Sequence, residues 1–266
     1  MMEFRTILYK KMEGIGTIIL NRPEVFNAYS EIMSSDLKEL LSEIAGDDSL
    51  RVVVIKGSGD NFMAGADIKM LKKWSNIARE SGWQKVKELL KDHFSPTLLE
   101  NLNQPVIAAV DGMAWGMGSE IALGCDMRIC TERATFSQPE INLGIITGSG
   151  ASQRLPRIVG KGKAMEMILT GGPINAQKAL ELGLVNEVVK PEELDQKVYG
   201  LAEKIISKSG LMVRWAKQCV NLVNDHDLYQ GIDKELNQFC QSFETHDAKE
   251  GTTAFLEKRK PEFRGK

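Results

Sequence analysis

The sequence predicts an α/β fold followed by a helical region. Two short, continuous apolar runs, at 52–55 and 106–110, have the composition of strands that are buried on both faces of a sheet, and 127–130, apolar apart from Arg128, is a third candidate. Between them, at 68–74 and 83–102, apolar residues follow helical spacing. Strands that alternate with helices favour a sheet built through crossover connections.

Further elements extend this pattern at both ends. Residues 6–10 and 16–21 are predicted strands, the second ending before Pro23, and 32–44 is a predicted helix. After about residue 190 the pattern is helical throughout, and the predicted helices span 191–206, 212–223, 230–245 and 248–258. We therefore predict an α/β core at 1–190 and a C-terminal helical subdomain at 191–266.

Composition narrows the classes of function. The 266 residues carry a formal net charge of −2, which argues against a nucleic-acid partner. There is neither a signal-peptide layout at the start nor an apolar stretch of bilayer length, so we expect a cytoplasmic protein with no membrane partner. The four cysteines lack CxxC spacing and the three histidines are scattered, so we expect no metal site.

Two glutamates stand in unusual surroundings. Glu120 follows a glycine-rich turn and opens an apolar run, and Glu140 follows Gln138 and Pro139 with apolar neighbours. Carboxylates are rarely placed on apolar stretches unless they are paired or functional. Two of them held over one substrate could handle both protons of an acid–base reaction.

Two turns of small residues, at 61–69 and 115–119, each lead into a predicted helix. Small residues let the backbone approach a ligand, and helix N-termini carry N–H groups without intrahelical partners. One N–H from each turn could therefore bind an oxyanion.

These motifs resemble those of the enoyl-CoA hydratase/isomerase (crotonase) family over essentially the whole chain. The matching pieces lie at 20–23, 27–28, 64–69, 105–112, 116–122, 138–144, 153–156, 176–189, 255–259 and 261–263. The resemblance implies a crotonase-like (ClpP/crotonase) spiral of ββα units. It also implies a homotrimer or hexamer in which the C-terminal helical subdomain forms much of the interface.

The resemblance implies an enoyl-CoA hydratase, because both catalytic glutamates of the hydratases are present as Glu120 and Glu140. Glu120 would activate the attacking water, and Glu140 would supply a proton to the α-carbon. The oxyanion hole would consist of the backbone N–H groups of Ala66 and Met117. The family usually has glycine at the position of Met117, but a backbone N–H serves whatever the side chain.

The resemblance also assigns residues to the substrate, an acyl-CoA thioester, and implies no separate cofactor. The coenzyme A positions are Arg22, Ala64, Asp67, Ile68, Lys69, Phe255 and Lys258, of which the last two often reach a neighbouring subunit's ligand in the family. The acyl pocket would include Trp115, Thr147 and Gly148. Typical hydratases have proline where Thr147 stands, so the resemblance does not determine which acyl group this loop accepts.

Several alternatives remain at this point. The nearest is an enoyl-CoA isomerase, and a narrower one is a cyclic dienoyl-CoA hydratase, suggested by the bulky Trp115 and Met117 and by Thr147. An RNA-binding relative would need a basic stripe, which the sequence lacks. A catalytically idle subunit disagrees with the presence of both glutamates.

Overall fold

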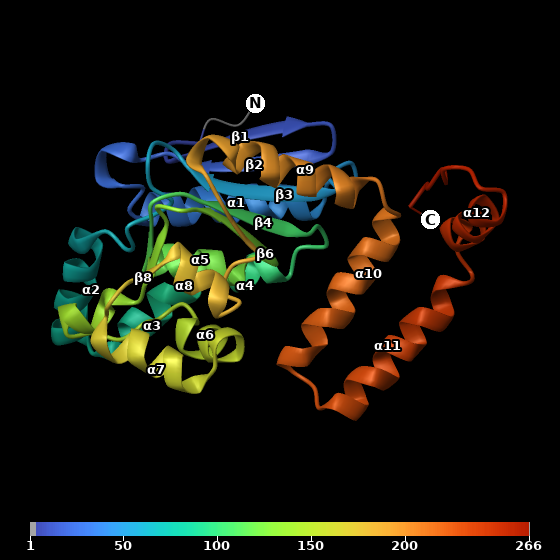
Figure 1. The fold of residues 1–266 in the computed structure, drawn as a ribbon. Helices are drawn as coiled ribbons and strands as arrows, with labels where there is room; N and C mark the ends of the chain where they lie inside the picture. Colours follow the sequence, from blue (N-terminus) through green and yellow to red (C-terminus); the bar gives the residue numbers. More distant parts are fainter. Residues whose placement is uncertain (1–3, 266) are drawn as a thin grey trace.

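The computed structural model describes residues 4–265, and its centre is a six-stranded sheet with the strand order β1-β2-β3-β4-β6-β9 (Figure 1). The first pair is antiparallel and the later neighbours are parallel. The strands are β1 (Ile7–Met12), β2 (Ile15–Leu20), β3 (Val52–Gly57), β4 (Val106–Val110), β6 (Met127–Thr131) and β9 (Glu187–Val189). A second sheet has the order β5-β7-β8, with β5 (Met113–Trp115), β7 (Thr135–Ser137) and β8 (Ile174–Asn175).

The strands β3 and β4 are apolar over 52–55 and 106–110 because each contributes to two cores, whereas β6 also buries Arg128 and Thr131. In β3, Val53 and Ile55 join the larger core, while Val52 and Val54 face the other side of the sheet. Side chains alternate between faces along a strand, so a strand covered on both sides needs apolar residues at every position. This confirms the interpretation of the apolar runs.

Helices pack on both faces of the main sheet and also continue beyond it. They are α1 (Glu31–Ala45), α2 (Ile68–Ser81), α3 (Trp83–Lys91), α4 (Thr97–Glu100), α5 (Met117–Gly124), α6 (Ala151–Val159), α7 (Lys161–Thr170), α8 (Ala176–Glu181), α9 (Leu194–Ile206), α10 (Gly210–Asn221), α11 (Leu228–Ser242) and α12 (His246–Leu256). Short 3₁₀ turns include η2 (Pro139–Leu143), which carries Glu140. The helical pattern predicted at 83–102 is in fact two helices, because Pro96 disfavours helical backbone at the residue before it.

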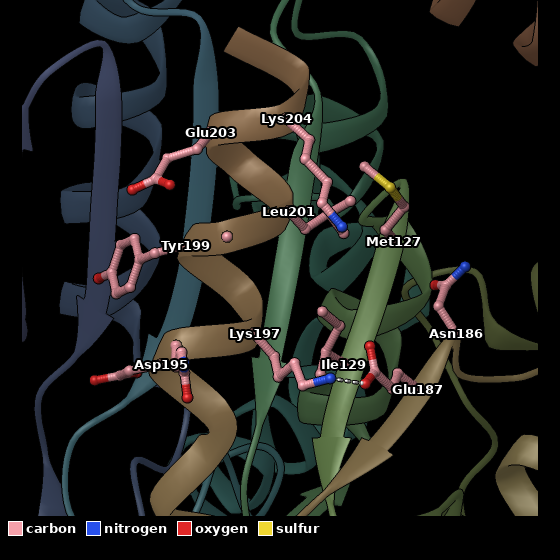
Figure 2. Close-up of a pocket in the computed structure, with 12 residues that line it drawn as sticks. Met127, Ile129, Asn186, Glu187, Asp195, Lys197, Tyr199, Leu201, Glu203 and Lys204 are labelled. Carbon is pink, nitrogen blue, oxygen red and sulfur yellow. Dashed lines mark hydrogen bonds and ion pairs between the residues drawn. The ribbon is translucent and has the colours of Figure 1, made fainter. Parts of the chain in front are cut away.

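The last four helices differ in what they contact. Helix α9 packs on the sheet, with Leu194, Val198 and Ala202 buried against the face that includes Val52 and Val54. A groove of about 760 Å³ lies beside α9 and the strands β6 and β9 (Figure 2). By contrast, α10, α11 and α12 extend away from the sheet (Figure 1). The division at residue 190 stays a prediction, and α9 packs with the residues before it.

Within residues 4–265, no helix has both the length and the hydropathy that crossing a bilayer requires.

Glycine at position 118 allows α5 to lie directly on Met63, in the segment between β3 and α2. A Cβ added there would be 2.4 Å from the carbonyl oxygen of Met63 and 2.8 Å from its Cβ. We predict that Gly118→Ala lowers the free energy of unfolding by about 1–3 kcal/mol, because backbone on both sides prevents relief of the overlap.

Urea denaturation checks this prediction. Gly162→Ala in α7 is the matched control, since a Cβ there meets nothing within 4 Å, and it should stabilise the protein by roughly 0.5–1 kcal/mol. Equal effects of the two substitutions would contradict the prediction.

Candidate active site

A cavity of about 600 Å³ contains both glutamates that the sequence singled out. Its wall includes Glu120 from α5, Glu140 from η2, and the backbone of Ala66 and Met117. The loop that carries Ala66 follows the carboxyl end of β3, the edge where open α/β sheets bind ligands, whereas α5 follows β5 and η2 follows β7 of the second sheet. The groove beside α9 is larger, but it contains none of these four residues, so chemistry rather than size identifies the site.

Two glycines bring the backbones of the two turns into contact. Gly65 and Gly116 have φ angles of +111° and +50°, which disfavour other residues. A Cβ on Gly65 would lie 3.3 Å from the carbonyl oxygen of Trp115, and one on Gly116 would lie 3.7 Å from the Cα of Gly65. A parallel bridge between Met63 and Ala114 aligns the two segments just before this point. The turns predicted to share a ligand are therefore neighbours.

The N–H groups of Ala66 and Met117 are available to a ligand. Tyr29 bonds to the carbonyl of Gly65 and the N–H of Asp67, so the intervening N–H of Ala66 faces away from Tyr29. Met117 begins α5, where N–H groups have no intrahelical acceptor. Within residues 4–265, the backbone hydrogen bonds give neither group an acceptor. Both residues line the cavity, so their donors suit an oxyanion.

Glu120 is held by one of its two oxygens. It is only 3% exposed, and its Oε1 accepts hydrogen bonds from the Thr147 hydroxyl (2.5 Å), the Ser149 N–H (2.7 Å) and the Ala151 N–H (3.2 Å). Donors of this kind stabilise negative charge on the oxygen. Among residues 4–265, no hydrogen bond involves Oε2, so that oxygen is free to accept a proton from a substrate water.

Glu140 has the opposite environment. Burial, with the charge of Glu120 acting in the same direction, raises the pKa of this carboxyl to about 7. Its Oε2 is buried and has no partner within the part of the chain that the structure describes. A Cβ on Gly116 would lie 2.9 Å from Oε1, so glycine there also makes room for this side chain. Glu140 can thus carry a proton near neutral pH and donate it into the cavity.

Of the three residues predicted for the acyl pocket, Trp115 and Gly148 line the cavity. The Trp115 indole donates to Thr135 Oγ1 at 3.0 Å, which fixes the ring. Thr147 is 8% exposed and lies against Glu120, outside the residues that form the wall.

The comparison with known proteins decides the family. A family profile described as enoyl-CoA hydratase/isomerase matches residues 10–266. The chain belongs to the enoyl-CoA hydratase/isomerase family. Crotonyl-CoA hydratase of Syntrophomonas wolfei is 41% identical over 266 residues, which cover 98% of this chain and 99% of that protein. Short-chain-enoyl-CoA hydratase of Clostridium acetobutylicum is 38% identical over 263 residues, 98% of each chain.

Solved structures of enoyl-CoA hydratases share the fold. The enoyl-CoA hydratase from Bacillus anthracis matches with a TM-score of 0.90 at 37% identity, covering 98% of this chain and 100% of that chain. The enoyl-CoA hydratase from Mycobacterium smegmatis matches with a TM-score of 0.89 at 34% identity, covering 97% and 99%. The predicted family and the predicted crotonase fold are both confirmed.

In this enoyl-CoA hydratase/isomerase family member, the residues predicted for coenzyme A fall in two places. Ala64 and Ile68 line the cavity, and Arg22 pairs with Asp67 at 3.3 Å beside them. Asp67 also caps α2 by accepting the N–H of Lys69 at 3.0 Å. Phe255 and Lys258 instead lie on α12 and just after it, outside the cavity wall, and the Phe255 side chain is 83% exposed.

Sequence reasoning missed several residues of this site. Met70 and Trp74 line the cavity from α2, and their helical spacing could have placed them on one face together. His93 also lines the cavity, and its ring meets Trp74 edge-on with centroids 5.3 Å apart. No sequence signal identified the N–H groups that bind Glu120, because they belong to the backbone.

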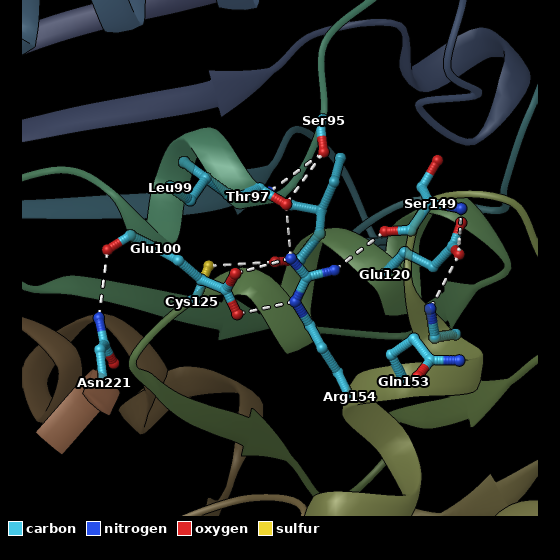
Figure 3. Close-up of polar contacts among 12 residues, drawn as sticks. Ser95, Thr97, Leu99, Glu100, Glu120, Cys125, Ser149, Gln153, Arg154 and Asn221 are labelled. Atoms are coloured by element: carbon cyan, nitrogen blue, oxygen red, sulfur yellow. Dashed lines mark hydrogen bonds and ion pairs between the residues drawn. The ribbon is translucent and has the colours of Figure 1, made fainter. Parts of the chain in front are cut away.

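Arg154 supports the loop that binds Glu120 (Figure 3). Its guanidinium forms two hydrogen bonds with the carboxylate of Glu100, at 2.7 and 2.6 Å, and donates to the carbonyl of Ser149 at 3.0 Å. The Ser149 N–H is one of the donors to Glu120. A partly buried, bidentate arginine thus fixes a loop that holds a carboxylate. Among residues 4–265, no group of three or more His, Cys, Asp or Glu side chains could hold a metal ion.

The raised pKa of Glu140 predicts a pH-dependent gain in stability for Glu140→Gln. Between the ordinary value of 4.5 and about 7, folded Glu140 keeps a proton that the unfolded chain has lost. Its contribution to stability therefore falls as the pH rises through this window. At pH 8 the variant should be more stable than the wild type by about 1–2 kcal/mol, allowing for partial solvation, and at pH 4.5 the difference should vanish.

Denaturation midpoints measured from pH 4.5 to 8 check this prediction. Glu181→Gln, at an exposed position on α8, is the control and should show no such trend. A gain for Glu140→Gln that is constant with pH would contradict the assignment.

Proposed function

We propose that the protein is an enoyl-CoA hydratase, a hydro-lyase that adds water across the 2,3 double bond of an enoyl-CoA thioester to give 3-hydroxyacyl-CoA. The observation that carries this proposal is one cavity containing Glu120, Glu140 and two backbone N–H groups without acceptors within residues 4–265. The names of the relatives, crotonyl-CoA hydratase and short-chain-enoyl-CoA hydratase, support it. They favour hydration over the isomerase and cyclic dienoyl alternatives, and we expect a short acyl chain.

In the proposed mechanism the thioester oxygen accepts hydrogen bonds from the N–H groups of Ala66 and Met117. When the β-carbon is attacked, negative charge moves onto this oxygen as an enolate forms. Donors that are already in place stabilise the enolate more than the neutral carbonyl, which lowers the barrier. Gly65 and Gly116 support this step because their close contact sets the positions of both donors.

Each glutamate transfers one of the two protons of the reaction. Oε2 of Glu120 accepts a proton from the water as the water oxygen bonds to the β-carbon. Glu140 donates its proton to the α-carbon, consuming the electron pair of the enolate. The product carries one hydroxyl and one new C–H bond, and proton exchange with solvent restores both carboxyl groups. The pKa of Glu140, about 7, suits the acid role, and the three donors on Glu120 suit the base role.

The central prediction is that wild-type protein hydrates crotonyl-CoA, while Glu120→Gln and Glu140→Gln each reduce kcat by roughly 10²–10⁴. Loss of the ultraviolet absorbance of the conjugated thioester measures the rate, and chromatography of the product distinguishes 3-hydroxybutyryl-CoA from a shifted alkene. Glu181→Gln is the control for loss of an exposed glutamate on α8 and should keep the wild-type rate.

Undiminished rates in both active-site variants would refute the role of the glutamates. An isomerised alkene as the sole product would refute the hydratase proposal itself.

A homotrimer, alone or paired into a hexamer, completes the proposal. Helices α10, α11 and α12 expose large apolar side chains, including Val220 (70%), Tyr229 (84%), Phe239 (58%) and Phe255 (83%). Apolar surface of this extent marks an interaction site. Phe255 and Lys258 would then contact coenzyme A bound to a neighbouring copy. A cytoplasmic location, the absence of a separate cofactor and the absence of a nucleic-acid or membrane partner remain predictions.

We predict that sedimentation gives three or six times the mass of one chain. Phe239→Asp should shift the protein toward smaller species, because a buried aromatic side chain contributes about 1.5–3 kcal/mol per copy. Met12→Asp, at a 70% exposed position on β1, is the control and should leave the assembly intact. A monomeric wild type at micromolar concentration would contradict this part of the proposal.

A further inference from the structure

Thr147 turns inward at the loop between η2 and α6. The preceding residue, Ile146, is 78% exposed, whereas Thr147 is 8% exposed. Its Oγ1 lies 2.5 Å from Oε1 of Glu120, which is itself buried. A threonine hydroxyl carries one proton, and an ionised carboxylate can only accept, so Thr147 is the donor in this pair.

This hydroxyl is the side-chain member of a three-donor set. The other two donors, the N–H groups of Ser149 and Ala151, are fixed by the path of the backbone and bind the same oxygen. A carboxylate offers about four lone-pair sites over two oxygens. Three donors on Oε1 therefore occupy that oxygen fully and leave Oε2 as the one that can accept a proton from water.

We propose that Thr147 is a positioning residue that keeps Oε1 of Glu120 bound to the loop, so that Oε2 faces the cavity as the base. This inference rests on the proposed hydratase function. The terminal torsion of a glutamate is broad, so the carboxylate can rotate when a donor is lost. The hydroxyl restrains that rotation and stabilises the charge that the base requires.

Other charged groups around Glu120 do not replace this contact. Glu140, across the cavity on η2, is itself a carboxyl group and makes no hydrogen bond to Glu120 within residues 4–265. Arg154 on α6 is hydrogen-bonded to Glu100 and the Ser149 carbonyl, and it interacts with the charge of Glu120 without a hydrogen bond to it within residues 4–265. His93 lines the same cavity, and burial lowers the pKa of its ring, which favours the neutral form. The hydroxyl thus supplies a direct side-chain donor to the base.

The test compares Thr147→Val, which keeps the shape and removes the hydroxyl, with Thr147→Ser, which keeps the hydroxyl. Both are assayed with crotonyl-CoA over pH 5 to 9. The valine variant should lose roughly 10- to 100-fold in kcat, the value of one hydrogen bond to a charged group. Its KM should stay within about threefold, because Thr147 lies outside the cavity wall. The serine variant should recover most of the rate.

The comparison of kcat with KM across this pH range separates positioning from general damage. Loss of the hydroxyl should lower the kcat of Thr147→Val throughout the range while its KM and the kcat of Thr147→Ser change little. The control is Thr17→Val, which removes a buried hydroxyl from β2 that lies 3.1 Å from the Tyr199 hydroxyl. It should leave kcat unchanged.

Three outcomes are decisive. A valine variant with wild-type kcat overturns the proposal. If Thr147→Val fails to fold, the serine variant decides: a rate within about threefold of wild type supports the role of the hydroxyl, and a loss as large as that expected for valine overturns it. A wild-type protein that hydrates no enoyl-CoA refutes the proposed function instead, and that result is obtained before any variant is made.

Discussion

The contact between the backbones at Gly65 and Gly116 is the constraint on which the rest of the site depends. Two loops that follow different strands must approach closely enough for one N–H from each to reach a single oxygen. A Cβ at Gly65 would press on the Trp115 carbonyl at 3.3 Å, one at Gly116 would meet Oε1 of Glu140 at 2.9 Å, and both residues have positive φ angles that disfavour side chains. The sheet orders these loops, Asn27 links the chain near Arg22 to Ser58 and Asn61, and Gly118 lets α5 lie on Met63.

The two glutamates differ because the fold satisfies one and leaves the other incompletely bonded. Glu120 sits on a helix and meets a loop whose N–H groups converge on its carboxylate. Glu140 sits on a 3₁₀ turn, where burial removes water and no partner within residues 4–265 replaces it at Oε2. An unbonded buried carboxyl is costly to the folded state, and functional sites are where such costs are found. Similar side chains thus acquire different proton affinities through their surroundings alone.

Much of this could be predicted from the sequence. Continuous apolar runs predicted β3 and β4, and helical spacing predicted the helices after residue 190, because burial determines both patterns directly. The glycine-rich turn before Glu120 and the Gln-Pro pair before Glu140 identified these two glutamates as the candidate catalytic residues. The strands β5, β7 and β8 are two or three residues long and left no detectable period. The contact of Thr147 with Glu120 joins residues far apart in the chain, and only the folded loop brings them together.

The main sheet separates the molecule into two compartments. Val53 and Ile55 belong to the side that holds the reaction chamber, while Val52 and Val54 face α9. Neighbouring positions in one strand therefore pack in different cores and are constrained by different neighbours. Substitutions on the face beneath α9 can change the free energy of unfolding without contacting the active-site cavity. Substitutions one residue away, on the opposite face, change the packing beneath the loops that carry the catalytic residues. Stability and catalytic activity can therefore change independently, although residues of one strand contribute to both.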